Sequence, residues 1–572
     1  MNFAPSGGGL KTRLGLCESS LSFSPPARQI IPLVFFSASL PNRLISERIA
    51  GSLRAETGAS VVLVRLEALN GAPALFPGRD GRATAVDWAP SEVVLQGQFG
   101  MPSNLVKAEA GFHVLTLNLA GGFPAPGSNT SLINYLSRQF RYVLVEVIVE
   151  VIDRSALLEF LRQEDLGYLF LRPSTDRIYQ LEKLWQELEP KSRHCKLALK
   201  PILCLADGEE MNACDRVIQR VTGPVHMFVH GCPSATALEP TPQSSETFNK
   251  DLRRLAREIG GKLVGLALSS GAAKGFAHIG VIQVLEEHGI EVDVVAGASI
   301  GAYIGALWTF GFKGTEIEEL ARELEGRWGF WSLIDPIFPP RRGFLRGLAL
   351  KKRLMRSIGE ASFADLERPL RVVVGNLATL DRTALASGEV AAAVHASMAV
   401  PGICVPVTLD GESFIDGGIV DPMPVEVLRE MGVDRVIAVN AIPTPDRIRS
   451  AILAERELAR QNGSRLRKLF RKAFPIDEQL NYFARGNLFE IVMRSVHGAQ
   501  VRLAEASCRL ADVVLRPDIC DDRWLDCRNP RRFINLGRES AERKLEEIRA
   551  LIGHNSNNHE HELAKETVAA VA

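Results

Sequence analysis

Short apolar runs and helical patterns alternate along the first half of the chain. The runs at residues 30–36, 61–64 and 168–171 are typical of buried strands, and the segments 44–57 and 176–188 carry apolar residues at helical spacing. Alternating strands and helices predict a parallel, doubly wound sheet, so we expect an α/β domain here. Further expected elements are strands at 114–117, 142–146 and 197–205 and helices at 132–140 and 155–162.

A helical segment in the middle of the chain separates this pattern from a second one. Apolar residues recur on one helical face from Phe248 to Ile259, and Gly260-Gly261 ends that helix. The preceding residues, 233–246, are rich in Pro, Ser, Thr and Ala, as inter-domain linkers are. We therefore expect two α/β domains. The expected parts are a disordered N-terminus at 1–27, a β/α domain at 28–232, the linker and helix at 233–261, a second α/β domain at 262–553 and a polar tail at 554–572.

The second pattern contains a serine motif. The pentapeptide from Gly297 to Gly301, with Ser299 at its centre, follows an apolar run at 292–296 that predicts a strand and opens an apolar run at 301–307 that predicts a helix. A G-x-S-x-G between strand and helix is the pattern of a nucleophile elbow. The serine then lies at a helix N-terminus, where free backbone N–H groups favour developing negative charge. The alternative is a glycine-rich turn with a buried serine and no chemistry.

Two further stretches carry polar chemistry. Upstream, an apolar run leads into a loop of small residues from Ser269 to Ala273, which is followed by Lys274 and a helical pattern. The backbone N–H groups of such a loop can point at an oxyanion. Downstream, the sequence Phe-Ile-Asp-Gly-Gly at 414–418 places the carboxylate of Asp416 at a strand end beside two glycines.

The loop, the serine and the Asp-Gly-Gly sequence together resemble the patatin-like phospholipase family, especially its bacterial members and the neuropathy target esterase branch. The similarity includes residues 274–307, 396–402 and 415–425 and covers roughly the second half of the chain. The resemblance implies a patatin-like α/β fold and a Ser–Asp dyad that works without histidine. Ser299 is then the nucleophile and Asp416 the general base.

The resemblance also implies an oxyanion hole in the glycine-rich loop. The implied residues are Gly271, Ala272, Ala273 and Lys274, the last standing where the family has Arg or Lys. The implied motif glycines are Gly275, Gly297, Gly301, Gly417 and Gly418. This chain departs from the usual run of glycines at Ser269, Ser270 and Ala272, and a positive φ would be costly at a residue with a Cβ.

The first half resembles the ParA/MinD type of P-loop ATPase, by pattern more than by motif. Those ATPases carry a glycine-rich loop with a lysine after the first strand, whereas residues 37–43 contain neither glycine nor lysine. The metal-proximal aspartate of that family aligns best with Glu146. The resemblance therefore implies a degenerate, non-hydrolysing domain with a structural or regulatory role. A simple scaffold domain and a live nucleotide site that regulates the second domain are the alternatives.

Composition narrows the class of protein and its compartment. The 572 residues include 67 Lys+Arg and 67 Asp+Glu, so charge gives no argument for nucleic-acid binding. The 9 cysteines, without a C-x-x-C pair, indicate buried thiols in a reducing compartment. Neither a signal peptide nor the roughly 18 apolar residues of a membrane span is present. We expect a cytoplasmic protein that contacts the inner face of the membrane at most peripherally and needs no metal or organic cofactor.

The histidines distinguish between types of serine hydrolase, because an α/β-hydrolase triad needs a histidine after its acid. His278, just past the small-residue loop, has the position of a helix-packing residue. The candidates after Asp416 are His497 in a helical stretch and His554, His559 and His561 in the polar tail. Since none of these makes a good third member, the pattern favours the dyad.

Two other segments suggest contact with lipid. Residues 465–474 place apolar side chains at helical spacing opposite a basic face, as helices on anionic membrane surfaces do. A helix packed on its own domain gives the same pattern. Residues 308–370 gather aromatic and arginine side chains, which suit a lid and acyl-chain entrance or an ordinary aromatic cluster under a long loop.

The sequence thus predicts a serine acyl hydrolase that cleaves phospholipid or lysophospholipid esters. A different class of protein is the alternative: a signalling or membrane-docking module with a silent hydrolase site, which the departures in the small-residue loop would favour. No pattern in the sequence specifies the head group, the acyl chain, the position cleaved or the oligomeric state.

Overall fold

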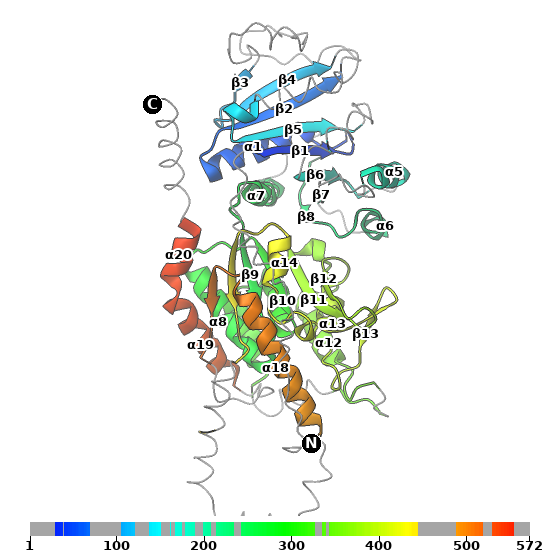
Figure 1. Cartoon of the computed structure of the whole chain (residues 1–572), viewed down its shortest axis with the longest axis vertical. Helices are drawn as coiled ribbons and strands as arrows, with labels where there is room; N and C mark the ends of the chain where they lie inside the picture. Colours follow the sequence, from blue (N-terminus) through cyan, green and yellow to red (C-terminus); the bar gives the residue numbers. More distant parts are fainter. Residues whose placement is uncertain are drawn as a thin grey trace, which may run out of the picture.

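The computed structural model contains two β-sheets stacked along the long axis of the molecule, with helix α7 (Pro242–Ile259) between them (Figure 1). We call residues 29–233 the N-terminal half and residues 262–553 the C-terminal half. The structure describes residues 29–37, 39–68, 105–119, 136–149, 161, 166–173, 178–188, 198–206, 213–233, 242–325, 335–338, 342–443, 453, 488–518 and 529–553.

The N-terminal sheet has 8 strands in the order β3-β4-β2-β5-β1-β6-β7-β8. Neighbouring strands are parallel, except that β3 runs antiparallel to β4 at the edge. Alternate side chains of a strand point to opposite faces, so one face packs on α1 and α7 and the other on α5 and α6. The strands are β1 Gln29–Phe35, β2 Val61–Ala68, β3 Leu105–Lys107, β4 His113–Leu119, β5 Tyr142–Ile148, β6 Leu166–Leu171, β7 Ala198–Cys204 and β8 Met227–Val229, and the helices are α1 Asn42–Thr57, α5 Ile178–Leu188 and α6 Ala213–Thr222.

The doubly wound α/β arrangement predicted for this half is confirmed. The predicted strands correspond to β1, β2, β4, β5, β6 and β7, and two of the predicted helices to α1 and α5. The prediction lacks β3, β8 and α6. The two strands have 3 residues each, which is too short for a hydrophobic period to appear. The predicted helices at 132–140 and 155–162 lie mostly outside the described residues.

The C-terminal sheet is mixed, in the order β13-β14-β11-β10-β9-β15-β16, with β12 beside β11. Its central strands β9, β10, β11 and β15 are parallel, whereas β12, β13 and β14 pair antiparallel. The parallel strands read as continuous apolar runs because helices cover both faces. The strands are β9 Val264–Leu268, β10 Val294–Ala298, β11 Leu370–Asn376, β12 Arg382–Leu385, β13 Val407–Leu409, β14 Glu412–Asp416, β15 Arg435–Val439 and β16 Val513–Leu515.

Helices enclose the C-terminal sheet as two outer layers. One face packs on α8, α9, α13 and α19, and the other on α14 and α18. The helices are α8 Ala277–Glu287, α9 Ile300–Phe310, α10 Gly314–Arg322, α12 Leu348–Ile358, α13 Val390–Ser397, α14 Val425–Glu430, α18 Leu488–Cys508, α19 Pro530–Arg543 and α20 Leu545–Gly553, with short 3-10 helices η1 Ala272–Phe276, η2 Phe363–Asp365 and η3 Gly417–Ile419.

The parallel strands of the C-terminal sheet begin on the side of the sheet that faces α7. Asp293, just before β10, contacts Arg257 of α7, and Glu367, just before β11, accepts a hydrogen bond from Arg254. The strands therefore end on the opposite side of the sheet. Loops that follow parallel strands gather at that carboxyl edge, so the loop after β9 and the serine after β10 meet far from the N-terminal half.

Two glycines let helices α8 and α19 cross at backbone contact distance. A Cβ on Gly280 would lie 1.9 Å from the carbonyl oxygen of Ile534, and one on Gly537 would lie 2.0 Å from that of Ala277. We expect Gly280→Ala to destabilise the fold by at least about 1–3 kcal/mol, because rigid backbone has to move. Thermal unfolding checks this. Gly498→Ala is the matched control, since nothing lies within 4 Å of its Cβ position; equal melting temperatures for the two variants would contradict the prediction.

Candidate active site

Ser299 stands at a sharp turn between β10 and α9. Its backbone has φ 54° and ψ −120°, a combination that costs a residue with a Cβ about 1–3 kcal/mol. The flanking glycines leave room for the turn. A Cβ on Gly297 would lie 2.6 Å from the backbone nitrogen of Ala302, and one on Gly301 would lie 2.3 Å from the carbonyl oxygen of Leu268. The pentapeptide therefore forms the strained strand-to-helix elbow that the sequence predicts.

Asp416 ends β14 and faces the serine. The Oγ of Ser299 donates a hydrogen bond of 2.7 Å to Asp416 Oδ2, across 117 residues of chain. The other carboxylate oxygen, Oδ1, accepts the backbone N–H of Gly418 at 2.6 Å. A Cβ on Gly417 would lie only 2.0 Å from the carbonyl oxygen of Val373, so glycine is needed for β14 to turn against β11. The structure thus brings the two predicted residues together and orients the carboxylate through the glycine that follows it.

Burial tunes the acidity of Asp416. The residue is 3% exposed, and removal from water raises the pKa of its carboxyl from 3.8 to about 6, although the hydrogen bonds from Ser299 and Gly418 act in the opposite direction. A carboxylate with this pKa is mostly ionised at neutral pH and is more basic than an exposed aspartate. Both properties suit a general base.

Ser397 supports the elbow through its hydroxyl, and no motif in the sequence singles this residue out. Its Oγ accepts the backbone N–H of Ser299 at 2.8 Å and donates to the carbonyl oxygen of Val373 at 2.6 Å. Ser397 is fully buried at the end of α13, 98 residues from the serine that it contacts. The only sequence signal was its place in the stretch 396–402 that resembles the patatin-like family, because a lone serine on a helix shows no pattern.

The small-residue loop between β9 and η1 packs against the elbow. A Cβ on Gly275 would lie 2.2 Å from Cγ2 of Ile300, and one on Gly301 would lie 2.7 Å from the carbonyl oxygen of Ser269. No acceptor in the described part of the chain receives the backbone N–H of Gly271, Ala272 or Ala273. Gly271 and Ala272 are half-buried and Ala273 is buried. Buried N–H groups are nearly always paired, so the N–H of Ala273 in particular is suited to an oxygen atom of a bound substrate.

The residues that replace glycine in this loop have identifiable effects. Ser269 fastens the loop to the segment after β15, because its Oγ accepts the backbone N–H of Ala441 at 2.9 Å and donates to the carbonyl oxygen of Ser270 at 2.8 Å. Ala272 has a φ of 50°, so this position does take the positive φ that the sequence analysis identifies as costly. The loop is thus strained at Ala272 and anchored at Ser269.

The strain at Ala272 predicts an unusual response to glycine. We expect Ala272→Gly to leave the free energy of unfolding unchanged or raise it by up to about 1 kcal/mol, because glycine adopts positive φ without penalty. Ala273 is buried in the same loop without a positive φ, so Ala273→Gly should lower the free energy of unfolding by about 1 kcal/mol. Chemical denaturation checks both values. Equal destabilisation by the two substitutions would contradict the φ argument.

Two histidines lie near this loop. His278 is fully buried, its Nε2–H donates to the carbonyl oxygen of Ser269 at 2.8 Å, and burial lowers its pKa to about 4, so it is neutral and packs the loop. His497 lies on α18, which packs against η3. Burial and the positive charge of Lys274 lower the pKa of His497. The partners of the Asp416 carboxylate are Ser299 and Gly418. His554, His559 and His561 lie outside the described residues.

Glu146 is the residue that the ParA/MinD resemblance aligns with a metal-proximal aspartate, and its carboxylate has several partners within the protein. Glu146 Oε1 accepts Nδ2 of Asn42 at 2.6 Å, and Oε2 accepts Oγ of Ser46 at 2.5 Å and Nε of Arg65 at 3.1 Å. Both oxygens of this buried side chain therefore accept hydrogen bonds from the protein itself.

Several predicted features lie partly or wholly outside the described residues. The basic helix at 465–474 is one, and so are Trp328, Phe330 and Trp331 of the aromatic segment. Within that segment, Phe338 is 94% exposed and Phe344 is 43% exposed. In the described part of the chain, no helix is both long and apolar enough to cross a membrane, and no cluster of His, Cys, Asp and Glu could hold a metal ion.

The C-terminal half is similar to known proteins. Residues 266–429 match the family model described as patatin-like phospholipase, and this segment contains the elbow, the loop and Asp416. The C-terminal half is therefore patatin-like in fold.

Among curated proteins, the chain is 32% identical over 202 residues to "Lysophospholipase nte1" of Aspergillus fumigatus, covering 35% of this chain and 13% of that protein. It is also 32% identical over 194 residues to "Lysophospholipase NTE1" of Pyricularia oryzae, covering 34% of this chain and 13% of that protein. The match thus spans only a small part of these relatives.

Among solved structures, a ParA family ATPase from Chlorobium tepidum is similar with a TM-score of 0.28 and 15% identity, over 41% of this chain and 92% of that one. VipD from Legionella pneumophila is similar with a TM-score of 0.26 and 16% identity, over 50% of this chain and 67% of that one. At these TM-scores the matches support no conclusion, and the fold rests on the strand order given above.

Proposed function

We propose that the chain is a serine acyl hydrolase that cleaves the ester bonds of phospholipids or lysophospholipids. The observation that carries the proposal is the 2.7 Å hydrogen bond from Ser299 Oγ to Asp416 Oδ2 at a strained elbow. The family match at 266–429 and the names of the fungal relatives support a lipid ester as the substrate. In this proposal residues 262–553 form the catalytic domain and residues 28–232 a regulatory or docking domain.

The geometry supports a two-step mechanism. Ser299 Oγ attacks the ester carbonyl carbon while Asp416 takes the serine proton, and the carbonyl oxygen becomes an oxyanion that accepts N–H groups of the loop 271–273. The tetrahedral adduct then expels the alcohol, which receives the proton from Asp416. Water, deprotonated by Asp416, attacks the acyl-serine, and the fatty acid leaves as Ser299 regains its proton.

The acidity of Asp416 predicts how the rate depends on pH. Only the ionised carboxylate can accept the serine proton, so kcat/KM should rise with pH through a midpoint near pH 6, the pKa to which burial raises this group, and level off about one pH unit higher. A profile of hydrolysis of a soluble short-chain ester between about pH 4.5 and pH 8 checks this. A limb near pH 4, the ordinary range of an aspartate, would contradict the burial argument.

The proposed function is tested by release of fatty acid from vesicles of phospholipid and of lysophospholipid. The wild-type chain should release fatty acid, and both Ser299→Ala and Asp416→Asn should abolish release. Turnover that survives Ser299→Ala would exclude this nucleophile. A folded wild type with neither turnover nor labelling by a serine-directed organophosphonate would support the silent docking module instead.

Peripheral contact with an anionic membrane is part of the same proposal. The exposed rings of Phe338 and Phe344 support it, because large exposed apolar side chains mark surfaces that meet a partner or a membrane. The vesicles of the hydrolysis assay, once pelleted, report it directly. Binding that is independent of the fraction of anionic lipid would contradict an electrostatic contact.

A further inference from the structure

Helix α7 contacts both halves of the molecule. Its apolar stripe lies in the core of the N-terminal half, and its buried charged side chains face outward from that core. The stripe consists of Phe248, Leu252, Leu255, Ala256 and Ile259. The buried charged residues are Asp251, Arg254, Arg257 and Glu258. Asp251 and Glu258 bind His230 and His226 of the N-terminal half. Arg254 and Arg257 are the members that contact the C-terminal half, at Glu367 and Asp293.

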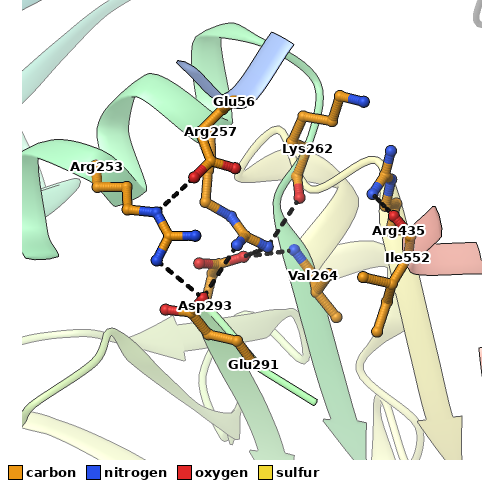
Figure 2. Close-up of polar contacts among 9 residues, drawn as sticks. All are labelled: Glu56, Arg253, Arg257, Lys262, Val264, Glu291, Asp293, Arg435 and Ile552. Atoms are coloured by element: carbon orange, nitrogen blue, oxygen red, sulfur yellow. Dashed lines mark hydrogen bonds and ion pairs between the residues drawn. The ribbon is translucent and has the colours of Figure 1, made fainter. Parts of the chain in front are cut away.

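Arg257 reaches from α7 to the base of the strand that carries the serine. Figure 2 shows the guanidinium of Arg257 directed at Asp293. Nη2 of Arg257 lies 2.9 Å from Oδ2 of Asp293, and Nη1 lies 3.2 Å from Oε2 of Glu291. The Arg257 and Asp293 side chains are 8% and 3% exposed. Burial raises the pKa of Asp293 to about 6, and the nearby guanidinium of Arg257 lowers it. Arg257 therefore keeps a buried carboxylate ionised directly before β10.

Asp293 in turn couples β10 to β9. Its Oδ2 accepts the backbone N–H of Val264 at 2.8 Å, and its own N–H donates to the carbonyl oxygen of Val264 at 2.8 Å. This two-way contact fixes the register of the two strands, in which Val294 lies opposite Gly265. The small-residue loop follows the carboxyl end of β9, and Ser299 follows the carboxyl end of β10. The relative position of the two strands therefore sets the distance between the N–H donors of the loop and the nucleophile.

The N-terminal half contacts α7 through residues that flank Arg257. Nε of Arg253, one turn before Arg257, lies 2.5 Å from Glu56 at the end of α1, but this side chain is 45% exposed, so the ion pair adds little to the hold on α7. On the neighbouring face, Glu258 accepts Nζ of Lys200 at 2.5 Å and Nε2 of His226 at 2.8 Å. Lys200 also donates to the carbonyl oxygen of Met431 in the C-terminal half. A movement of the N-terminal half would therefore displace α7 and, with it, Arg257.

We propose that Arg257 is a positioning residue for Ser299, and that through α7 the N-terminal half is part of the scaffold that aligns the nucleophile with the oxyanion loop. This inference rests on the proposed function of Ser299. In this proposal the N-terminal half has a mechanical role that needs no nucleotide. The same role accounts for the buried charges of Arg254, Arg257 and Asp293 at the side of the C-terminal sheet that faces α7.

Arg257→Met in the full chain tests the inference. We expect kcat to fall about tenfold with KM nearly unchanged, because a small shift of the strands misaligns reacting groups without altering lipid contacts. The rate of Ser299 labelling by an organophosphonate should fall by the same factor, since labelling needs the same alignment. Arg257→Lys, which keeps the charge, should recover part of both rates.

The control is Arg253→Met, on the same helix one turn earlier. Arg253 contacts Glu56 and Glu291 but not Asp293, and its side chain is 45% exposed. We expect its kcat and labelling rate to stay within about twofold of wild type, as the loss of an exposed ion pair has a small effect. Wild-type rates in a folded Arg257→Met variant would overturn the inference and leave the proposed function standing. A wild type without turnover or labelling would overturn both.

Removing one member of a buried ion pair can prevent folding, and a second variant covers that outcome. The double variant Arg257→Met with Asp293→Asn has no buried charge at this point, and the asparagine oxygen can still accept the N–H of Val264. We expect it to fold and still to show the reduced kcat and labelling rate. Full activity of the folded double variant would overturn the positioning role.

Discussion

Asp416→Asn is expected to lower kcat by roughly 10³- to 10⁴-fold with little change in structure, because the amide cannot take the serine proton. The substitution conserves shape: the side-chain oxygen can still accept the N–H of Gly418, and the amide nitrogen can face Oγ of Ser299. Initial rates of fatty-acid release check it. A loss of less than about tenfold would mean that another group acts as the base.

The same variant should be more stable than the wild type, in a manner that depends on pH. Burial raises the pKa of the Asp416 carboxyl in the folded state from 3.8 to about 6, so the folded state holds this proton more tightly than the unfolded state. The stability that protonation supplies is fully present below pH 3.8 and is lost as pH rises through about 6. Asparagine carries no charge, and at pH 8 the variant should gain about 3 kcal/mol over the wild type.

Thermal unfolding at about pH 5 and pH 8 separates the cost of the buried charge, which depends on pH, from any effect of the substitution that does not. The gain in melting temperature of Asp416→Asn over wild type should be about twice as large at the higher pH as at the lower one. Ser299→Ala is the control, because it abolishes the reaction while leaving the carboxylate buried, so its melting temperature should not gain in this way. A pH-independent difference for Asp416→Asn would contradict the burial of a charged carboxylate.

The parts of the site that sequence could predict are those written in short contiguous stretches. Ser299 and Asp416 were predictable because a strand, a turn of glycines and a helix are local patterns, and the family resemblance joined the two stretches. The sequence shows that a positive φ at Ala272 would be costly, but it cannot predict the sign of this φ, because the backbone angles of one residue depend on the loop around it. The structure shows that the angle is positive and that Ser269 anchors the loop.

Contacts between distant stretches could not be predicted in the same way. The contact of Arg257 with Asp293 spans two elements whose own patterns indicate only an amphipathic helix and a strand end. The amphipathic period of α7 showed that one face is apolar, yet it could not show that the opposite face is buried as well. A charged face is usually solvated, whereas here residues of both halves bury Asp251, Arg254, Arg257 and Glu258.

Ser397→Ala is the second substitution for which we expect a large effect. Its Oγ is the acceptor for the N–H of Ser299 and the donor to the carbonyl oxygen of Val373, so alanine leaves two buried backbone groups unpaired. The fold should lose about 1–3 kcal/mol. The elbow keeps its strained φ only while its surroundings enforce it, so kcat should fall by roughly 10²-fold although the dyad is intact.

Organophosphonate labelling and denaturant unfolding, measured together, separate the two consequences of this substitution. The exposed Ser495 on α18 supplies the control. Its hydroxyl donates to the carbonyl oxygen of Ile491 on the same helix, so for Ser495→Ala we expect both measurements to match wild type. If Ser397→Ala were destabilised but labelled at the wild-type rate, the hydroxyl would stabilise the fold without aligning the nucleophile. A loss of both would mean that the nucleophile elbow depends on a helix that carries no catalytic group.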